Sequence, residues 1–281
     1  MKVIAVFGPT GVGKTAVAIA LAAKLRERGE DPVAVSADAL QVYDGLPILT
    51  GAADAPKDTR LIGFVPIDQT FSAGAFAARA HAEIDSLLAQ GRLPIVVGGT
   101  GLYLRAALAD LDLRPPVDPA LRAAIAARDL GELHAALPGE LNIRPTDTQR
   151  ILRASELIAA GHEPPQGDQL WTTHTRHPTL LAALIMDRDR LYANIDARVD
   201  AMVQQGAIDE VRAAAPRASS TARKALGFEE LLAGDVERMK TNTRRYAKRQ
   251  LTWLRKLPGA HLIDVTGRTP DDVAAELIAI M

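Results

Sequence analysis

The sequence predicts an α/β protein: a parallel β-sheet flanked by helices, with an all-helical domain inserted into the chain. Short apolar runs rich in β-branched residues alternate with longer helical patterns over the first 112 residues. This alternation is typical of parallel strands joined by crossover helices. From residue 113 onward, helical patterns punctuated by prolines replace the strand patterns. We therefore predict a core formed by residues 1–112 and 178–281 and a helical insertion domain at 113–177.

The amino-terminal half supplies three strands and two helices. We predict buried strands at residues 2–7, 32–38 and 93–101, the last ending in a glycine turn, and helices at residues 14–29 and 72–92. The first helix is alanine-rich and stops at Gly29. For the second, Ser72 is a possible N-cap and Gly91 a stop.

The carboxy-terminal half returns to the sheet after the predicted insert. The apolar run TLLAALIM predicts a further strand at residues 179–186. The elements predicted beyond it are a long amphipathic helix at 189–215, a strongly basic helix at 237–257, a last strand at 260–266 and a closing helix at 271–281.

Composition narrows the class of protein. Hydrophobic residues make up 48% of the 281 residues and charged residues 24%, which suits a globular core. The formal net charge is −1, so any nucleic-acid site must be a local patch. The absence of cysteine excludes disulfides, thiolate zinc sites and cysteine catalysis. The first apolar run is too short for a signal peptide and no apolar stretch reaches 18 residues, so we expect a soluble cytoplasmic protein without a membrane span.

The first loop carries the pattern G-x-x-x-x-G-K-T, from Gly8 to Thr15, between a predicted strand and a predicted helix. Glycines in this pattern let successive backbone N–H groups converge on phosphate oxygens, and the following helix presents its positive N-terminus. Lys14 adds a cation, and the Thr15 hydroxyl can ligate a magnesium ion. We predict the phosphate-binding loop of a P-loop NTPase-like fold, with the identity of the phosphate compound left open.

Polar residues follow the second and third predicted strands. Asp38 and Gln41 lie just beyond the second strand, at the sheet edge where α/β proteins bind ligands. The Asp38 carboxylate can accept a proton from a nucleophile or hold magnesium through water, and a helix cap is the alternative. The third strand runs into residues 98–101, GGTG, which offer the Thr100 hydroxyl but no acid. An ATPase usually ends a later strand in a magnesium-binding acid, and Asp187, after another apolar run, is the rival candidate.

A basic segment covers residues 240–256, which contain seven Lys or Arg and no acidic residue. Arg245, Lys248 and Arg249 are three and four residues apart and therefore share one helix face. In a chain of net charge −1, this local excess suits a polyphosphate backbone. The predicted insert carries a second basic cluster of Arg144, Arg150 and Arg153. Thr146 and Asp147 are possible caps of the helix that carries Arg150 and Arg153.

Together these segments resemble one family. GPTGVGKT, SADALQVY, GGTGLYL, TDTQRILRASEL, RVDAM…GAIDEV, KALGFEEL and YAKRQLTWLR occur in the order found in bacterial tRNA dimethylallyltransferases, from about residue 3 to about residue 255. The resemblance implies an enzyme that transfers the dimethylallyl group of dimethylallyl diphosphate to N6 of the adenosine 3′ to the anticodon. It also implies Mg2+ as cofactor, the tRNA anticodon stem-loop as partner, and a monomer without an obligate protein partner.

The resemblance implies roles for individual residues. Asp38 matches the family's base, Thr100 the residue that touches the acceptor, and Lys224 a cation on the diphosphate. The residues implied for diphosphate binding are Gly8, Thr10, Gly11, Val12, Gly13, Lys14, Thr15 and Arg223, with Thr15 as metal ligand. Those implied for tRNA binding are Asp38, Ala39, Leu40, Gln41, Thr100, Arg122, Gln149, Arg150, Ile151, Leu152, Arg153, Arg245, Lys248 and Arg249. Family members often have arginine where Lys224 stands, so the charge is kept here and the bidentate fork is lost.

Three alternatives remain open. A small-molecule kinase using ATP would place its magnesium on Asp187. A prenyltransferase acting on free adenine nucleotides would share the core chemistry, although Arg150 and Arg153 favour a larger acceptor. A noncatalytic RNA-binding protein would use the basic helix without needing Asp38.

Overall fold

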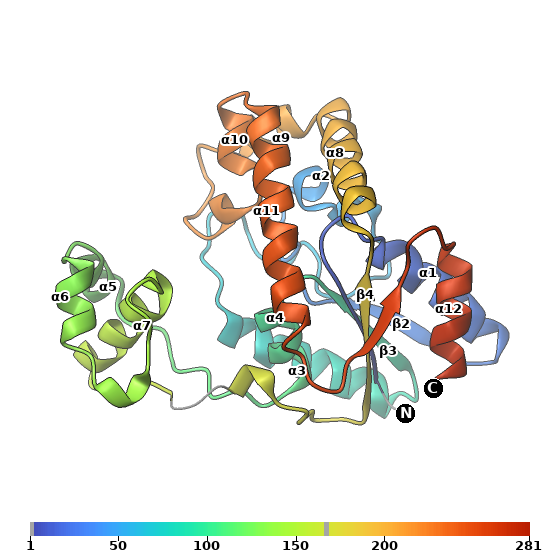
Figure 1. Cartoon of the computed structure of the whole chain (residues 1–281), viewed down its shortest axis with the longest axis horizontal. Helices are drawn as coiled ribbons and strands as arrows, with labels where there is room; N and C mark the ends of the chain where they lie inside the picture. The colour runs from blue at the N-terminus through green and yellow to red at the C-terminus, as the bar shows by residue number, and fades with distance from the viewer. Residues whose placement is uncertain (1–2, 166–168) are drawn as a thin grey trace. The chain divides into compact units, whose positions relative to one another are not determined.

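The computed structural model describes residues 3–165 and 169–281 (Figure 1). Its larger unit is built on a five-stranded sheet in the order β2-β3-β1-β4-β5, with every neighbouring pair parallel. The strands are β1 (Val3–Phe7), β2 (Pro32–Ser36), β3 (Leu93–Gly98), β4 (Thr179–Ile185) and β5 (His261–Asp264). The predicted fold class is confirmed, because all five predicted apolar runs pair in one parallel sheet with helices on its faces.

The register of the sheet brings three loops together. Phe7 of β1 lies opposite Gly98 of β3, and Ser36 of β2 lies opposite Val97 of β3. The carboxyl ends of β1, β2 and β3 are therefore level. The loop after each of these strands emerges at the same edge of the sheet, which is where ligands bind in open α/β folds.

Helices cover both faces of the sheet. On one face α1 (Lys14–Glu27) packs beside α12 (Pro270–Ala279), and the cluster beneath them includes Ile4 and Val6 of β1 (Figure 1). Alternate side chains of a strand point to opposite faces, so Ala5 and Phe7 face the other side. There α3 (Ala73–Ala89) packs against α4 (Gly101–Leu108). Ser72 caps α3 as predicted, accepting a hydrogen bond from the Ala75 amide.

The chain between β2 and α3 forms short turns to which the sequence assigned no element. They include α2 (Pro47–Thr50) and the 3₁₀ turn η1 (Ala52–Asp54). The backbone N–H groups of Ile48 and Leu49 donate to the two carboxylate oxygens of Glu210, each at 2.8 Å. This carboxylate satisfies the amino-terminal end of α2 and fixes the segment near the sheet edge.

The predicted helix at 189–215 is two helices. They are α8 (Arg188–Gln204) and α9 (Ala207–Ala214), and the predicted continuity is wrong because Gly206 adopts φ +99° between them. This left-handed conformation is accessible to glycine and breaks the helical ladder. The chain continues through η4 (Ala222–Lys224) and α10 (Phe228–Leu232) to the basic helix α11 (Val236–Leu254).

Ion pairs fasten the basic helix α11 to α8. Arg244 Nη1 lies 2.7 Å from both carboxylate oxygens of Asp196, and Lys240 Nζ lies 2.7 Å from Asp200. Figure 1 shows α8 rising from the carboxyl end of β4 with α11 beside it. Two of the seven cations of the basic segment therefore serve packing, while Arg245, Lys248 and Arg249 are exposed.

Residues Leu111–Gln169 form a second, smaller unit. Its helices are α5 (Pro119–Ala126), α6 (Leu130–Ala135), η2 (Gly139–Leu141), α7 (Thr148–Ala159) and the first residue of η3 (Gln169–Trp171). Ile125, Leu133 and Ile151 form its small core, and residues 111–165 contain no strand. Residues 166–168 of the predicted insert lie outside the described residues.

Residues 170–177, assigned to the insert from the sequence, group with the larger unit instead. The cause is the buried Arg105 of α4, whose Nη2 donates to Thr172 Oγ1 at 3.0 Å and to the His174 carbonyl at 2.9 Å. A buried guanidinium needs such acceptors, so this stretch of chain is held against α4. Within the described residues, no helix is both long enough and apolar enough to cross a bilayer.

Candidate active site

The loop between β1 and α1 has the conformation of a phosphate cradle. Gly11 and Gly13 adopt φ +82° and +94°, and a Cβ at Gly11 would lie 2.8 Å from Ile195 Cγ1, so both glycines are needed. Gly13 caps α1 without a side-chain hydrogen bond. The first N–H groups of α1 and its positive helix end are thus available to an anion.

Lys14 stands at the start of α1 as a half-buried cation. Its Nζ donates to the Pro9 carbonyl at 2.9 Å. The pKa of Lys14 is lowered to about 8, chiefly because burial disfavours the charged amine and secondly because Arg198 is close, while Asp38 opposes the shift. A partly desolvated amine beside a second cation is stabilised by an anionic ligand, so the local electrostatics favour a phosphate here.

Asp38 occupies the loop after β2. Its Oδ1 accepts a hydrogen bond from the Leu40 amide at 2.9 Å and closes a turn. The helix-cap alternative for Asp38 is wrong, because the next helix begins at Pro47. Gln41 is oriented by Ser36, whose hydroxyl donates to Gln41 Oε1 at 2.7 Å. The carboxylate of Asp38 is therefore positioned by its own turn with Oδ2 left for another partner.

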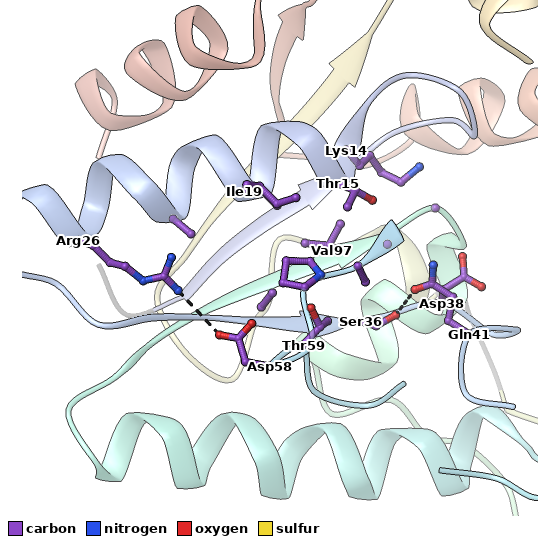
Figure 2. Close-up of a pocket in the computed structure, with 17 residues that line it drawn as sticks. Lys14, Thr15, Ile19, Arg26, Ser36, Asp38, Gln41, Asp58, Thr59 and Val97 are labelled. Carbon is purple, nitrogen blue, oxygen red and sulfur yellow. Dashed lines mark hydrogen bonds and ion pairs between the residues drawn. The ribbon is translucent and has the colours of Figure 1, made fainter. Parts of the chain in front are cut away.

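Two cavities adjoin at Asp38. One of about 260 Å³ runs between α1 and β2, and Figure 2 shows Lys14 and Thr15 on one wall and Ser36, Asp38 and Gln41 across from them. The other, of about 300 Å³, is lined by the glycine-rich loop and by side chains of α8 and α11. Five residues line both cavities: Lys14, Thr15, Asp38, Gln41 and Gly99. A group bound on the loop and a group entering from the other side would meet at the Asp38 carboxylate.

The turn after β3 allows close backbone approach. A Cβ at Gly98 would lie 2.6 Å from the Ala37 carbonyl, and a Cβ at Gly101 would overlap the Trp253 ring. The Thr100 hydroxyl lies 3.1 Å from the Tyr246 hydroxyl of α11. Burial raises the pKa of Tyr246, so its hydroxyl stays protonated at neutral pH. The glycines thus let the GGTG turn reach both β2 and the basic helix.

Gln250, which the sequence analysis missed, joins the two glycine-rich loops. Its Oε1 accepts from the Thr10 amide at 2.9 Å, and its Nε2 donates to the Gly99 carbonyl at 2.6 Å. The side chain is buried on the face of α11 that also carries Ala247 and Leu254. An uncharged polar residue on the apolar stripe of an otherwise basic helix is the sequence signal that points to such a role.

We expect Gln250→Leu to loosen both loops. The substitution leaves the Thr10 amide and the Gly99 carbonyl without partners, so the free energy of unfolding should fall by about 1–3 kcal/mol. Displacement of the loops should also lower kcat/KM by about 10- to 100-fold. Thermal denaturation and steady-state kinetics measure the two effects, with Thr252→Leu on the exposed face of α11 as control. A loss of stability with unchanged kcat/KM would reduce Gln250 to a packing role.

The two cations near Gly227 do not line either cavity. Arg223 donates to Glu229 Oε1 at 2.9 Å and to the Ala215 carbonyl at 3.0 Å, and its guanidinium lies over the Phe228 ring. Lys224 is exposed. The cavity wall in this region is formed by the next two residues of the chain, Ala225 and Leu226.

Asp187 is used as a helix cap. Its Oδ1 accepts from the Asp189 and Arg190 amides at 3.0 and 3.1 Å, and the residue is exposed. It lines neither cavity. The magnesium acid that a kinase would require is therefore not supplied by Asp187.

The tRNA residues expected in the smaller unit lie on or near α7. Asp147 caps α7 as predicted, and Gln149 and Arg150 are exposed behind it. Ile151 is buried in the core of this unit, and Leu152 packs against that core. The remaining two cations are paired with one acid: Arg122 and Arg153 each lie 3.2 Å from a carboxylate oxygen of Glu156.

Sheet, phosphate cradle and adjacent carboxylate define a P-loop enzyme. The family model described as IPP transferase matches residues 41–257. The chain belongs to this family, whose members are prenyl-transferring enzymes.

Named relatives and solved structures agree with this family. The chain is 40% identical over 98% of its length to the tRNA dimethylallyltransferase of Anaeromyxobacter sp. (strain K), 95% of which is covered. It is similar to the tRNA isopentenylpyrophosphate transferase of Bacillus halodurans, with a TM-score of 0.70, 30% identity and coverage of 99% and 95% of the two chains. A eukaryotic dimethylallyltransferase acting on tRNA gives a TM-score of 0.77 at 26% identity, covering 99% of this chain and 77% of that one.

Proposed function

We propose that the chain is a tRNA dimethylallyltransferase that moves the dimethylallyl group of dimethylallyl diphosphate to N6 of the adenosine 3′ to the anticodon and releases diphosphate. The observation that carries the proposal is the position of Asp38, which lines both adjoining cavities opposite the phosphate cradle in a chain of the IPP transferase family. The alternative of a kinase is not supported by Asp187, its candidate magnesium-binding acid, because Asp187 caps α8 and lines neither cavity.

The diphosphate end of the donor is proposed to bind the loop amides and Lys14. The Thr15 hydroxyl faces the same space and fits as a protein ligand of Mg2+. Among the described residues no group of three or more His, Cys, Asp or Glu could hold a metal by itself, which suits an ion bound mainly by substrate phosphates and water. When bound, Mg2+ supplies positive charge to the departing diphosphate. Lys14 and the loop amides hold the same oxygens in place as the C–O bond breaks.

Asp38 is proposed to accept the proton of the attacking amine. The N6 lone pair of adenine is delocalised into the ring, so a carboxylate beside it makes attack easier. Gln41 and Thr100 lie at the same sheet edge and are proposed to contact the flipped base, together with the backbone of Ala39 and Leu40. Flipping the adenosine out of the anticodon loop costs a few kcal/mol, which contacts to the rest of the RNA must offset.

The two units are proposed to divide these tasks. The larger unit carries the chemistry and presents Arg245, Lys248 and Arg249 on the outer face of α11 to the RNA backbone. The smaller unit presents the exposed residues of α7, Gln149 and Arg150, to the anticodon stem-loop. A monomer suffices for this proposal.

Neutralising the α11 patch should weaken tRNA binding. We expect Arg245→Gln/Lys248→Gln/Arg249→Gln to lower affinity at low salt and to reduce the slope of log K against log [salt], since fewer counterions are released. Filter binding over a salt series measures both quantities. The matched control replaces three exposed cations of α8 and α9: Arg188, Arg190 and Arg212. An equal loss in the control variant would make the effect one of net charge, not of this patch.

The decisive test is mass spectrometry of an anticodon stem-loop after incubation with enzyme, Mg2+ and dimethylallyl diphosphate. The expected product carries one dimethylallyl group in place of an N6 hydrogen. Equal activity on AMP would favour a free-nucleotide prenyltransferase. An unmodified stem-loop together with tight ATP binding would reject the proposal in favour of a kinase.

A further inference from the structure

Arg198 is a cation of the phosphate cleft that the assigned roles leave unused. It projects from α8 into the 300 Å³ cavity, whose wall it shares with Thr10, Lys14 and Thr15 of the glycine-rich loop. It lies close enough to Lys14 to disfavour the charged form of that amine. Two cations therefore face each other across the space proposed for the diphosphate.

Nothing in the described part of the chain neutralises Arg198. The acids on either side of it in α8, Asp196 and Asp200, are turned to α11 and pair with Arg244 and Lys240. The carboxylates that line the cavity are Asp38 and Asp54, and neither forms an ion pair with Arg198. A guanidinium that is partly withdrawn from water and close to a second cation is stabilised by an anion, so Arg198 is placed to receive one from outside the chain.

The backbone holds the Arg198 side chain in place. A Cβ at Gly51 would overlap Arg198 Nη2 and lie 3.2 Å from its Cζ, so the guanidinium rests directly on the Gly51 backbone. Gly51 also adopts φ +68° at the end of α2, which favours glycine. The turn is itself anchored, since Glu210 of α9 binds the amino-terminal end of α2. The Gly51 turn thus bounds one side of the Arg198 fork before any ligand arrives.

We infer that Arg198 binds the diphosphate of the donor opposite Lys14 and stabilises it as a leaving group. This inference rests on the proposed function. It gives the site the bidentate guanidinium that Lys224 cannot supply and that Arg223 does not supply in this structure, because Arg223 is bonded to Glu229 and the Ala215 carbonyl. A planar fork accepts two phosphate oxygens at once, whereas the Lys14 amine acts as a point charge.

The balance of the reaction shows when Arg198 matters most. The C1–O bond of the donor breaks, its electron pair goes to the diphosphate oxygen, the N6–C1 bond forms, and the N6 proton passes to Asp38. Negative charge on the diphosphate grows as the C1–O bond breaks. Arg198 should therefore contribute to donor binding and, more strongly, to the rate of bond cleavage.

The test compares Arg198→Gln with Arg198→Lys, using Arg188→Gln as control on the exposed face of α8, where the Arg188 side chain is 76% exposed. Calorimetric titration with inorganic diphosphate and excess Mg2+ reads binding directly. We expect about 10- to 100-fold weaker binding for Arg198→Gln and a smaller loss for Arg198→Lys, which keeps the charge without the fork. In transfer assays kcat should fall as well, while the KM for the stem-loop stays unchanged.

Gly51→Ala provides an independent variant that alters no charge. The methyl group that this substitution adds should displace the guanidinium and weaken diphosphate binding several-fold. If circular dichroism shows that Arg198→Gln does not fold, Gly51→Ala tests the inference in its place. The inference would be overturned if Arg198→Lys bound diphosphate as tightly as the wild type does and a folded second variant, Arg198→Gln or Gly51→Ala, did the same. Wild-type enzyme that binds diphosphate but transfers no dimethylallyl group would instead reject the proposed function, so the two failures are distinguishable.

Discussion

Asp38→Asn should strongly slow dimethylallyl transfer while leaving tRNA binding intact. The asparagine side chain keeps the size of aspartate, and its Oδ1 can still accept the Leu40 amide hydrogen bond that closes the turn. The substitution removes the basicity and the negative charge of the carboxylate. Removal of a general base typically costs 10²–10⁴-fold in rate, and we expect kcat to fall by about this factor. Single-turnover transfer to the stem-loop and filter binding of tRNA measure the two properties separately.

The control for this prediction is Asp58→Asn. Asp58 lines the 260 Å³ cavity at its far end, pairs with Arg26 and has a 63% exposed side chain, so the substitution removes the same charge away from Asp38 (Figure 2). We expect nearly wild-type kcat from it. If Asp38→Asn retained more than about a tenth of wild-type kcat, another group would be the base, and transfer at wild-type rate would favour a role in binding alone.

The sheet and its loops could be predicted because local sequence determines them. Five apolar runs between turn residues gave five parallel strands, of which the edge strand β5 buries only Ile263, and the spacing from Gly8 to Thr15 allows few backbone conformations other than the cradle. The position of Asp38 also followed, since a residue just past a parallel strand must lie at the ligand-binding edge. These features need no knowledge of which helix packs where.

The features that escaped prediction depend on contacts between distant segments. The sequence shows that Arg198 is a charged residue within a helical pattern. What its side chain faces depends on the turn at Gly51 and the loop at Lys14, which are distant in sequence. Gln250 likewise acts through two loops that precede it by 240 and 151 residues. The carboxy-terminal boundary of the insert differs from the predicted one for the same reason. Hydrogen bonds from Arg105 to residues 172 and 174 hold this stretch in the larger unit.

The break at Gly206 is a different kind of error. The amphipathic pattern continues on both sides of this glycine, with Met202 and Val211 both buried, so periodicity alone favours one helix. The positive φ of Gly206 redirects α9 so that Glu210 reaches the amides of α2. A glycine inside an amphipathic pattern is better treated as a potential helix end than as a tolerated interruption.

The kcat/KM for dimethylallyl diphosphate should fall as pH rises through about 8, the pKa of Lys14. Burial and the neighbouring Arg198 lower this pKa, so the free enzyme loses the Lys14 proton well below the usual lysine range. Only the protonated amine attracts the diphosphate, and each further pH unit should cost about tenfold in kcat/KM. The activity therefore falls with rising pH, because Lys14 is protonated below about pH 8 and loses its charge above it.

Lys14→Arg separates this effect from the ionisation of the substrate. Arginine stays charged throughout the range, whereas the ionisation of diphosphate affects both enzymes equally, so the ratio of wild-type to variant kcat/KM should decline above pH 8. The bound diphosphate stabilises the protonated amine, which places the corresponding limb of kcat at higher pH than that of kcat/KM. A ratio that stays flat to pH 9.5, about 1.5 units above the expected midpoint, would exclude Lys14 as the titrating contact. Such a result would also weaken the case that Arg198 and Lys14 share one anion.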